Sequence, residues 1–121
     1  NPLFGELMRV EHWTNAVDQG VAAAHRLLVG AGVAEPFAPF PYFWSDQYGA
    51  KIQFVGRARP DDEVTIAHGS VADRQFVALY GRAGRLVGAL GMNRPRILMD
   101  CRRMLTEPTG IEQALEHLAT I

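Results

Sequence analysis

Apolar and small residues in the first third of the chain recur at steps of three and four. Between Trp13 and Leu28 these positions are Ala16, Val17, Gly20, Ala23, Ala24, Leu27 and Leu28. The spacing predicts an amphipathic helix over residues 13–28, and Gly30 and Gly32 predict its end. Because most of these residues are small, we expect this side of the helix to pack closely against a large neighbouring surface.

A proline-rich stretch follows the helix. Residues 35–41 have the sequence EPFAPFP, and its prolines exclude a continuous helix. We therefore place a domain boundary here. It divides the chain into residues 1–30, a linker of residues 31–41 and a second domain of residues 42–121.

Beyond the linker the period of the apolar residues changes to two. Ile52 and Phe54 alternate with polar neighbours, and so do Val64 and Ile66. The stretches RQFVALYG and RLVGALGM flank residues 82–84, Arg-Ala-Gly, which predicts a hairpin connection. Together these patterns predict an antiparallel sheet of four to five strands.

Helical periodicity returns after the last predicted strand. The Asn93-Arg94-Pro95 step predicts a helix start, with Asn93 or Arg94 as the capping side chain and Pro95 in the first turn. The apolar face of this helix consists of Ile97, Leu98, Cys101, Met104 and Leu105. Residues 111–118 form a last short helix. The whole pattern predicts an α+β fold, a sheet covered by C-terminal helices and preceded by one helix of another domain.

Composition indicates a folded domain and excludes several classes of protein. The 121 residues are 48% hydrophobic and 21% charged, which is typical of a globular chain rather than a disordered one. No apolar run approaches the roughly 20 residues of a membrane span, and no signal peptide is visible, so we predict a cytoplasmic protein without a membrane partner. The single cysteine, Cys101, excludes an internal disulfide, and we expect it to be buried.

Motifs of stand-alone enzymes are absent from the sequence. There is no P-loop, no nucleophile elbow and no glycine-rich dinucleotide motif. The four histidines lie on different predicted elements without the spacing of metal ligands, so we predict no metal site. A pI of about 6.5, and the separation of the arginines from the aromatic rings, argue against a nucleic-acid partner.

Positive charge gathers in the second half of the chain. Residues 82–103 contain six arginines and a single acid, Asp100. The arginines are Arg82, Arg85, Arg94, Arg96, Arg102 and Arg103. This stretch predicts either a solvated face or a surface that steers an acidic partner.

An aromatic cluster follows the linker. The sequence PYFWSDQYG at residues 41–49 places four aromatic rings within seven residues. An indole or a phenol needs a polar partner when it is buried, so a strand that only fills a core has simpler choices. The cluster therefore indicates either the centre of a core or the wall of a binding site.

A second stretch, RVEHWTNAVDQG, lies at the start of the predicted first helix. It places Glu11, His12 and Trp13 at the helix N-terminus, where free backbone N–H groups suit a planar, electron-rich cofactor. In the alternative interpretation, Thr14 or Asn15 caps the helix and Trp13 folds into the core.

Taken together, NPLFGELMRVEHWTNAVDQG and PYFWSDQYGAKIQFVG resemble the C-terminal third of the FAD-dependent, NAD(P)H-dependent ferredoxin reductases that serve oxygenases and cytochromes P450. These are the putidaredoxin, rubredoxin and biphenyl-dioxygenase ferredoxin reductases. The resemblance implies that residues 1–30 end an FAD-binding domain and that residues 42–121 form the reductase C-terminal domain. It also implies FAD as cofactor, NAD(P)H as substrate, and a [2Fe-2S] ferredoxin or a rubredoxin as partner.

The same resemblance assigns roles to particular residues. Glu11, His12 and Trp13 would line the flavin, largely through main-chain groups, and Trp44, flanked by Phe43, would lie beside it on the route of electrons to the partner. The arginine-rich stretch becomes a candidate docking surface, with Arg82, Arg85 and Arg94 as its residues.

The nucleotide-binding motifs of such reductases would precede Asn1, so we expect no catalysis by these 121 residues alone. The N-terminal FAD and NAD domains of the same parent chain would then be further partners, and a separated piece would bury its apolar helix face by self-association. The alternative is a non-enzymatic α+β interaction or dimerisation module. A stand-alone flavin-binding domain is a weaker third interpretation, because no phosphate-binding loop is present.

Overall fold

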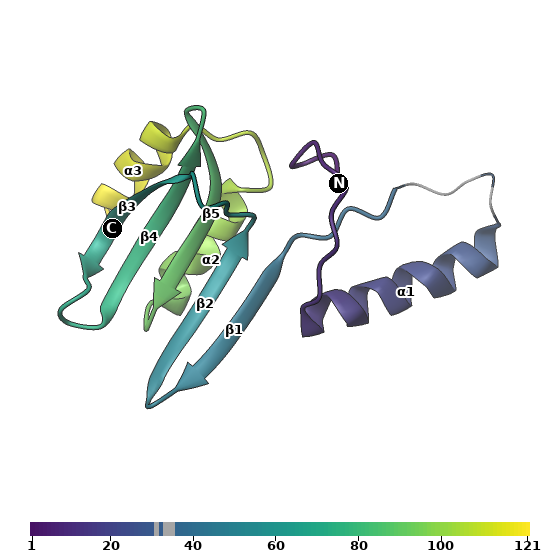
Figure 1. Ribbon diagram of the computed structural model, residues 1–121, viewed down its shortest axis with the longest axis horizontal. Helices are drawn as coiled ribbons and strands as arrows, with labels where there is room; N and C mark the ends of the chain where they lie inside the picture. The colour runs from purple at the N-terminus through teal and green to yellow at the C-terminus, as the bar shows by residue number, and fades with distance from the viewer. Residues whose placement is uncertain (31, 33–35) are drawn as a thin grey trace.

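The computed structural model describes residues 1–30, 32 and 36–121. It shows a sheet with helices on one face and a separate long helix beyond one edge of the sheet (Figure 1). The linker predicted at residues 31–41 includes positions 31 and 33–35, which lie outside the described residues.

The long helix is α1, Trp13–Val29, and it projects away from the sheet (Figure 1). Its bounds confirm the helix predicted over residues 13–28. It ends at Gly30, whose φ of 81° lies in the region that favours glycine. Asn15 is the buried residue of this helix, so most of its surface has no cover in the described part of the chain.

Five strands form one antiparallel sheet. They are β1 Tyr42–Gln47, β2 Ala50–Gly56, β3 Glu63–Ser70, β4 Gln75–Arg82 and β5 Arg85–Met92. Their order is β1-β2-β5-β4-β3, and each neighbouring pair is antiparallel. The predicted sheet of four to five antiparallel strands is therefore confirmed, with β1 and β3 at its edges.

Two tight turns set the register of the hairpins. The connection predicted at residues 82–84 is present, and both Ala83 and Gly84 have positive φ, at 50° and 75°. Tyr48 and Gly49 form the β1–β2 turn in the same way, with φ of 49° and 77°. Positive φ at both central residues is the mark of a type I′ turn, whose twist matches that of the strands it joins.

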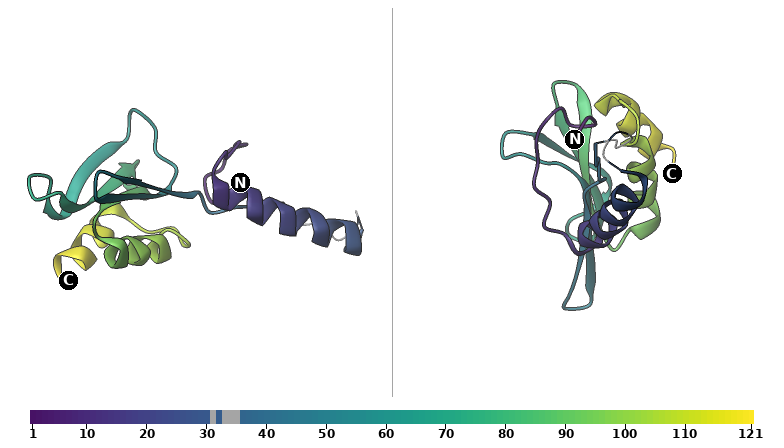
Figure 2. Two further views of the ribbon diagram at one scale, coloured as in Figure 1. Left: turned by 90° about the horizontal axis from the view of Figure 1, so that it is seen from below. Right: turned by 90° about the vertical axis from the view of Figure 1, so that its right-hand side faces the viewer.

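Helices α2, Pro95–Met104, and α3, Ile111–Ala119, cover one face of the sheet (Figure 2). The core between these layers consists of Val55, Val77, Leu79, Leu86, Ala89, Ile97, Leu98, Cys101, Leu105, Ala114 and Leu118. A Cβ on Gly91 would stand only 3.2 Å from the Cβ of Leu98, so this glycine lets α2 approach β5 closely. Cys101 is buried as predicted, and burial raises the pKa of its thiol to about 12.

The predicted side-chain cap of α2 is wrong. Arg94 occupies the N-cap position without a side-chain hydrogen bond to the helix, although Pro95 lies in the first turn as expected. The Asn93 Oδ1 atom instead accepts from the backbone N–H of Lys51 at 2.8 Å, and its Nδ2 donates to the carbonyl of Arg74 at 3.0 Å. Asn93, which follows β5, thus links β2 to the turn before β4. Its side chain makes these long-range hydrogen bonds instead of capping α2.

The face of the sheet opposite α2 and α3 is also apolar, and we call it the open face. Because side chains alternate along each strand, the strand registers place on it Phe43, Ile52, Phe54, Val64, Ile66, Phe76, Tyr80, Leu90 and Met92. Phe43 stacks on Phe54 with ring centroids 5.7 Å apart, and Phe54 meets Tyr80 edge-on at 5.4 Å. In the described ranges neither α2 nor α3 covers this face (Figure 2).

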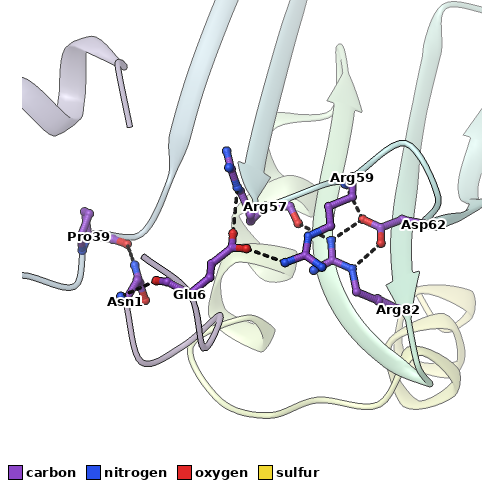
Figure 3. A network of polar contacts seen from close by, with 7 residues as sticks. All are labelled: Asn1, Glu6, Pro39, Arg57, Arg59, Asp62 and Arg82. Atoms are coloured by element: carbon purple, nitrogen blue, oxygen red, sulfur yellow. Dashed lines mark hydrogen bonds and ion pairs between the residues drawn. The ribbon is translucent and has the colours of Figure 1, made fainter. Parts of the chain in front are cut away.

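A buried ion pair fastens the start of β3 to the end of β4 (Figure 3). The Asp62 side chain is fully buried and accepts from Arg82 Nε at 2.6 Å and Nη2 at 2.7 Å. It also accepts from the backbone N–H of Arg59 at 2.6 Å. The hydrogen bonds from Arg82 hold the pKa of Asp62 below its usual 3.8, so the carboxylate is ionised at neutral pH.

Replacing Asp62 by asparagine is expected to lower the free energy of unfolding by about 1.5–3 kcal/mol, because charged hydrogen bonds to Arg82 are lost and Arg82 is itself only partly exposed. Since the folded-state pKa is depressed, this contribution is present above pH 3.8 and is lost as the pH falls through the folded-state value. Urea unfolding at neutral pH and at about pH 3 measures both effects. Asp73→Asn, at an exposed position, is the control, and equal losses in both variants would contradict the assignment.

Candidate functional site

The first turn of α1 docks on β1, an edge strand of the sheet. The Thr14 hydroxyl donates to the carbonyl of Tyr42 at 2.9 Å, and Asn15 Nδ2 donates to the carbonyl of Val10 at 2.7 Å. His12 occupies the N-cap position, and no side chain caps the helix. The alternative in which Thr14 or Asn15 caps α1 is therefore wrong, since Thr14 binds β1 and Asn15 binds the residues before the helix instead.

Four rings meet at this edge, and we call them the aromatic clasp: His12, Trp13, Phe43 and Trp44. The ring centroids of Trp13 and Trp44 are 5.7 Å apart in an edge-on contact, and those of His12 and Phe43 are 5.1 Å apart. Phe43 and Trp44 are adjacent on a strand, so they point to opposite sides of it. The two ring contacts therefore lie on either side of β1.

The tryptophans of the clasp remain open to solvent. Trp13 is 73% exposed and Trp44 is 39% exposed, so the alternative in which Trp13 folds into the core is wrong for the described part of the chain. Tyr42 stacks on Trp44 with centroids 5.9 Å apart. Rings that are held in place and yet exposed suit a surface that receives another flat group.

A groove of about 440 Å³ lies on the histidine side of the clasp. It is lined by Arg9, Val10, Glu11, His12, Pro41, Phe43, Phe54, Gly56, Arg57 and Ala58. Burial, and to a lesser degree the positive charge of Arg57, lower the pKa of His12 below its usual 6.5. The neutral imidazole is therefore favoured at neutral pH, and its buried Nδ1 has no hydrogen-bond partner among the described residues.

Glu11 lies at the rim of this groove. Its carboxylate pairs with Arg9 at 2.7 Å, and both side chains are exposed. The structure thus brings together all five residues that the sequence assigned to a cofactor, although Glu11 directs its charge toward Arg9.

The three arginines predicted for docking do not form one patch. Arg82 is held by Asp62 inside the domain, whereas Arg85 is exposed at the start of β5. Arg94 follows the other end of β5, which puts it roughly 25–30 Å from Arg85 at the usual rise of a strand.

Sequence reasoning missed two arginines near the clasp. The Arg102 guanidinium lies over the Tyr42 ring, 5.7 Å from its centroid. The positive charge of Arg57 helps to lower the pKa of His12. Arg102 belongs to the arginine-rich stretch, but only the fold reveals that its helix faces Tyr42. Arg57 lies outside that stretch, and no local pattern marks it.

The described ranges contain neither a candidate metal site nor a candidate membrane-spanning helix. No group of three or more His, Cys, Asp and Glu side chains there could hold a metal ion. Among the helices described, none combines the length and the apolar character needed to cross a membrane.

Comparison with known proteins gives consistent matches along the chain. The family model described as Reductase C-terminal matches residues 42–117. The chain is 35% identical over 116 residues to the 3-phenylpropionate/cinnamic acid dioxygenase ferredoxin–NAD(+) reductase component of Photorhabdus laumondii subsp. laumondii. That match covers 95% of this chain and 28% of the relative.

Solved structures match to a similar extent. The ferredoxin reductase for the CYP199A2 system from Rhodopseudomonas palustris is 37% identical with a TM-score of 0.75, over 96% of this chain and 30% of that one. The reductase in a covalent putidaredoxin reductase–putidaredoxin complex is 24% identical with a TM-score of 0.78. That match covers 99% of this chain and 30% of the reductase, and it shows that the two share a fold. The chain thus spans less than a third of the length of these proteins.

Proposed function

Because this chain belongs to the Reductase C-terminal family, whose model matches residues 42–117, we propose that it is the C-terminal part of a flavoprotein ferredoxin reductase. The longer protein would pass electrons from NAD(P)H through FAD to a [2Fe-2S] ferredoxin or a rubredoxin that serves an oxygenase or a cytochrome P450. Support comes from a relative that is a ferredoxin–NAD(+) reductase component. The observation that carries the proposal is the aromatic clasp, where the two motifs meet.

The clasp fits a flat, electron-rich ring system such as the flavin of FAD. Because no side chain caps α1, its first backbone N–H groups are available to a ring carbonyl, and the helix dipole favours negative charge there. We propose that Glu11, His12 and Trp13 contact the flavin with their main-chain groups. Phe43 and Trp44 would contact it with their rings.

The chemistry of the reaction belongs to the cofactor. Bound FAD supplies hydride acceptance and one-electron transfer, and the chain's residues orient and shield the ring. Trp44 has an exposed side and also contacts Trp13, so it is the clasp ring that we propose for the route of electrons to the partner.

Trp44→Ala in the longer reductase is expected to slow reduction of the ferredoxin several-fold more than reduction of the flavin by NADH. Stopped-flow absorbance follows the two steps separately, and Trp44→Phe, which keeps an aromatic ring, should lie between the alanine variant and the wild type. The 121-residue chain mixed with FAD is a second control and should not oxidise NADH. Equal losses in both steps would mean that the ring is only structural.

We also propose that Arg85, at the opposite end of β5 from Arg94, contributes to a positive surface for the acidic partner. Arg85 carries the test, because it is exposed and forms no ion pair in the described part of the chain, whereas the charge of Arg82 is matched by Asp62.

Arg85→Glu should slow ferredoxin-dependent cytochrome reduction, and the loss should shrink as ionic strength rises. Arg74→Glu, in the turn before β4, makes the same charge change away from the proposed surface. If both variants behave alike at every salt concentration, Arg85 belongs to an ordinary solvated face.

The open face and the exposed side of α1 are apolar surfaces without cover in the described part of the chain. A sheet with apolar residues on both faces is normally covered on both, and the matched relatives are more than three times as long as this chain. We propose that the N-terminal FAD and NAD domains of the longer protein cover these surfaces.

In the isolated chain the same surfaces are expected to drive self-association, which light scattering over a concentration series measures. Ile66→Asp, on the open face, should weaken association, whereas Val71→Asp, in the β3–β4 turn, should not. A chain that stays monomeric throughout the series would count against covered surfaces.

A further inference from the structure

The segment before α1, residues 1–12, forms no helix or strand, and we call it the strap. It leads directly into His12 and Trp13. Near its start, Asn1 Nδ2 donates to the carbonyl of Pro39 at 2.8 Å (Figure 3). Its later residues line the groove beside the clasp.

One carboxylate joins the strap to the sheet domain. Glu6 Oε1 lies 3.1 Å from Arg57 Nε, and Glu6 Oε2 lies 2.5 Å from Arg59 Nη2 (Figure 3). The Glu6 side chain is only 22% exposed. Hydrogen bonds from Arg59 and then Arg57 hold its pKa below the usual 4.5, so the carboxylate is ionised when it pairs.

The two arginines that receive Glu6 are themselves fixed to the sheet. The backbone N–H of Arg57 donates to the carbonyl of Val87 at 2.8 Å, and its own carbonyl accepts from Arg82 Nη2 at 3.1 Å. The backbone N–H of Arg59 donates to the buried carboxylate of Asp62. Glu6 therefore binds to groups whose main chain is already held in place.

The far end of the strap has few other restraints. Beyond Glu6, the Val10 carbonyl accepts from Asn15 in the first turn of α1, and Thr14 holds that turn to β1. Most of α1 is exposed, and in the described part of the chain it packs chiefly against β1. The orientation of His12 and Trp13 therefore depends on how the strap is held.

We propose that Glu6 is a positioning residue, whose ion pairs with Arg57 and Arg59 hold the strap so that His12 and Trp13 close on Phe43 and Trp44. The proposal concerns the geometry of the clasp and does not depend on bound flavin. Its failure is therefore distinguishable from failure of the proposed function.

The 121-residue chain offers a direct spectroscopic readout. It contains two tryptophans, Trp13 and Trp44, so all its indole signals arise from the clasp. Two indoles with centroids 5.7 Å apart couple their electronic transitions and give a paired positive and negative band, a couplet, in circular dichroism.

Glu6→Gln and Glu6→Ala are expected to reduce the couplet several-fold, while amide hydrogen exchange in β4 and β5 stays at the wild-type rate. Exchange is the discriminating measurement, because Glu6 does not belong to the core. Glu116→Gln, which removes an exposed carboxylate from α3, should change neither signal.

The two arginines that pair with Glu6 are tested in the same way. The double variant Arg57→Gln with Arg59→Gln should lose the couplet to the same extent, and adding Glu6→Gln to it should cause little further loss. High salt should weaken the wild-type couplet more than that of Glu6→Gln.

Three results would overturn the proposal. They are a wild-type chain without a couplet, Glu6 variants that keep the full couplet, and a couplet that falls only together with exchange protection in β4 and β5. If Glu6→Gln removes the couplet in the 121-residue chain but leaves the flavin spectrum of the longer reductase unchanged, the positioning role stands and the flavin assignment is contradicted.

Discussion

A carboxylate buried in a protein stays ionised only when hydrogen-bond donors or positive charges compensate for its lost hydration, and in this domain that requirement falls on Asp62. Its bonds to Arg82 and to the main chain of Arg59 fix the connection between β2 and β3. That connection presents the guanidinium groups that receive Glu6. A buried ion pair at one end of the sheet thus holds the loop whose arginines bind Glu6 of the strap. The strap in turn leads into the clasp at the sheet edge.

The two faces of the sheet have different roles although both are apolar. One face buries its side chains under α2 and α3 and supplies the core. The other exposes a row of aromatic contacts that runs from Phe43 through Phe54 to Tyr80, and the clasp lies at the edge where this row ends. The position of the clasp beside an uncovered apolar surface is consistent with a site that is completed by other domains.

Periodicity predicted the elements of the fold, because a helix or strand that is buried on one side has apolar residues at regular spacings in the sequence. It identified α1, the β4–β5 hairpin and the buried Cys101. The capping predictions failed because Thr14 and Asn93 each have a long-range acceptor or donor that no local pattern shows. The clasp residues were named through the resemblance, but their pairing across β1 follows only from the fold. Glu6 and Arg57 are 51 positions apart, so their contact has no local signal at all.

The arginines show why a count of charges does not identify a docking surface. Arg82 lies in the most basic stretch of the sequence, yet its charge is matched inside the domain by Asp62. Arg102, from the same stretch, lies over the ring of Tyr42, which stacks on Trp44, which in turn contacts Trp13. This series of contacts places a cation from α2 at one end of the rings that form the clasp. The distance of this charge from the rings is set by the packing of α2 on the sheet, so the position of Arg102 in the sequence does not reveal it.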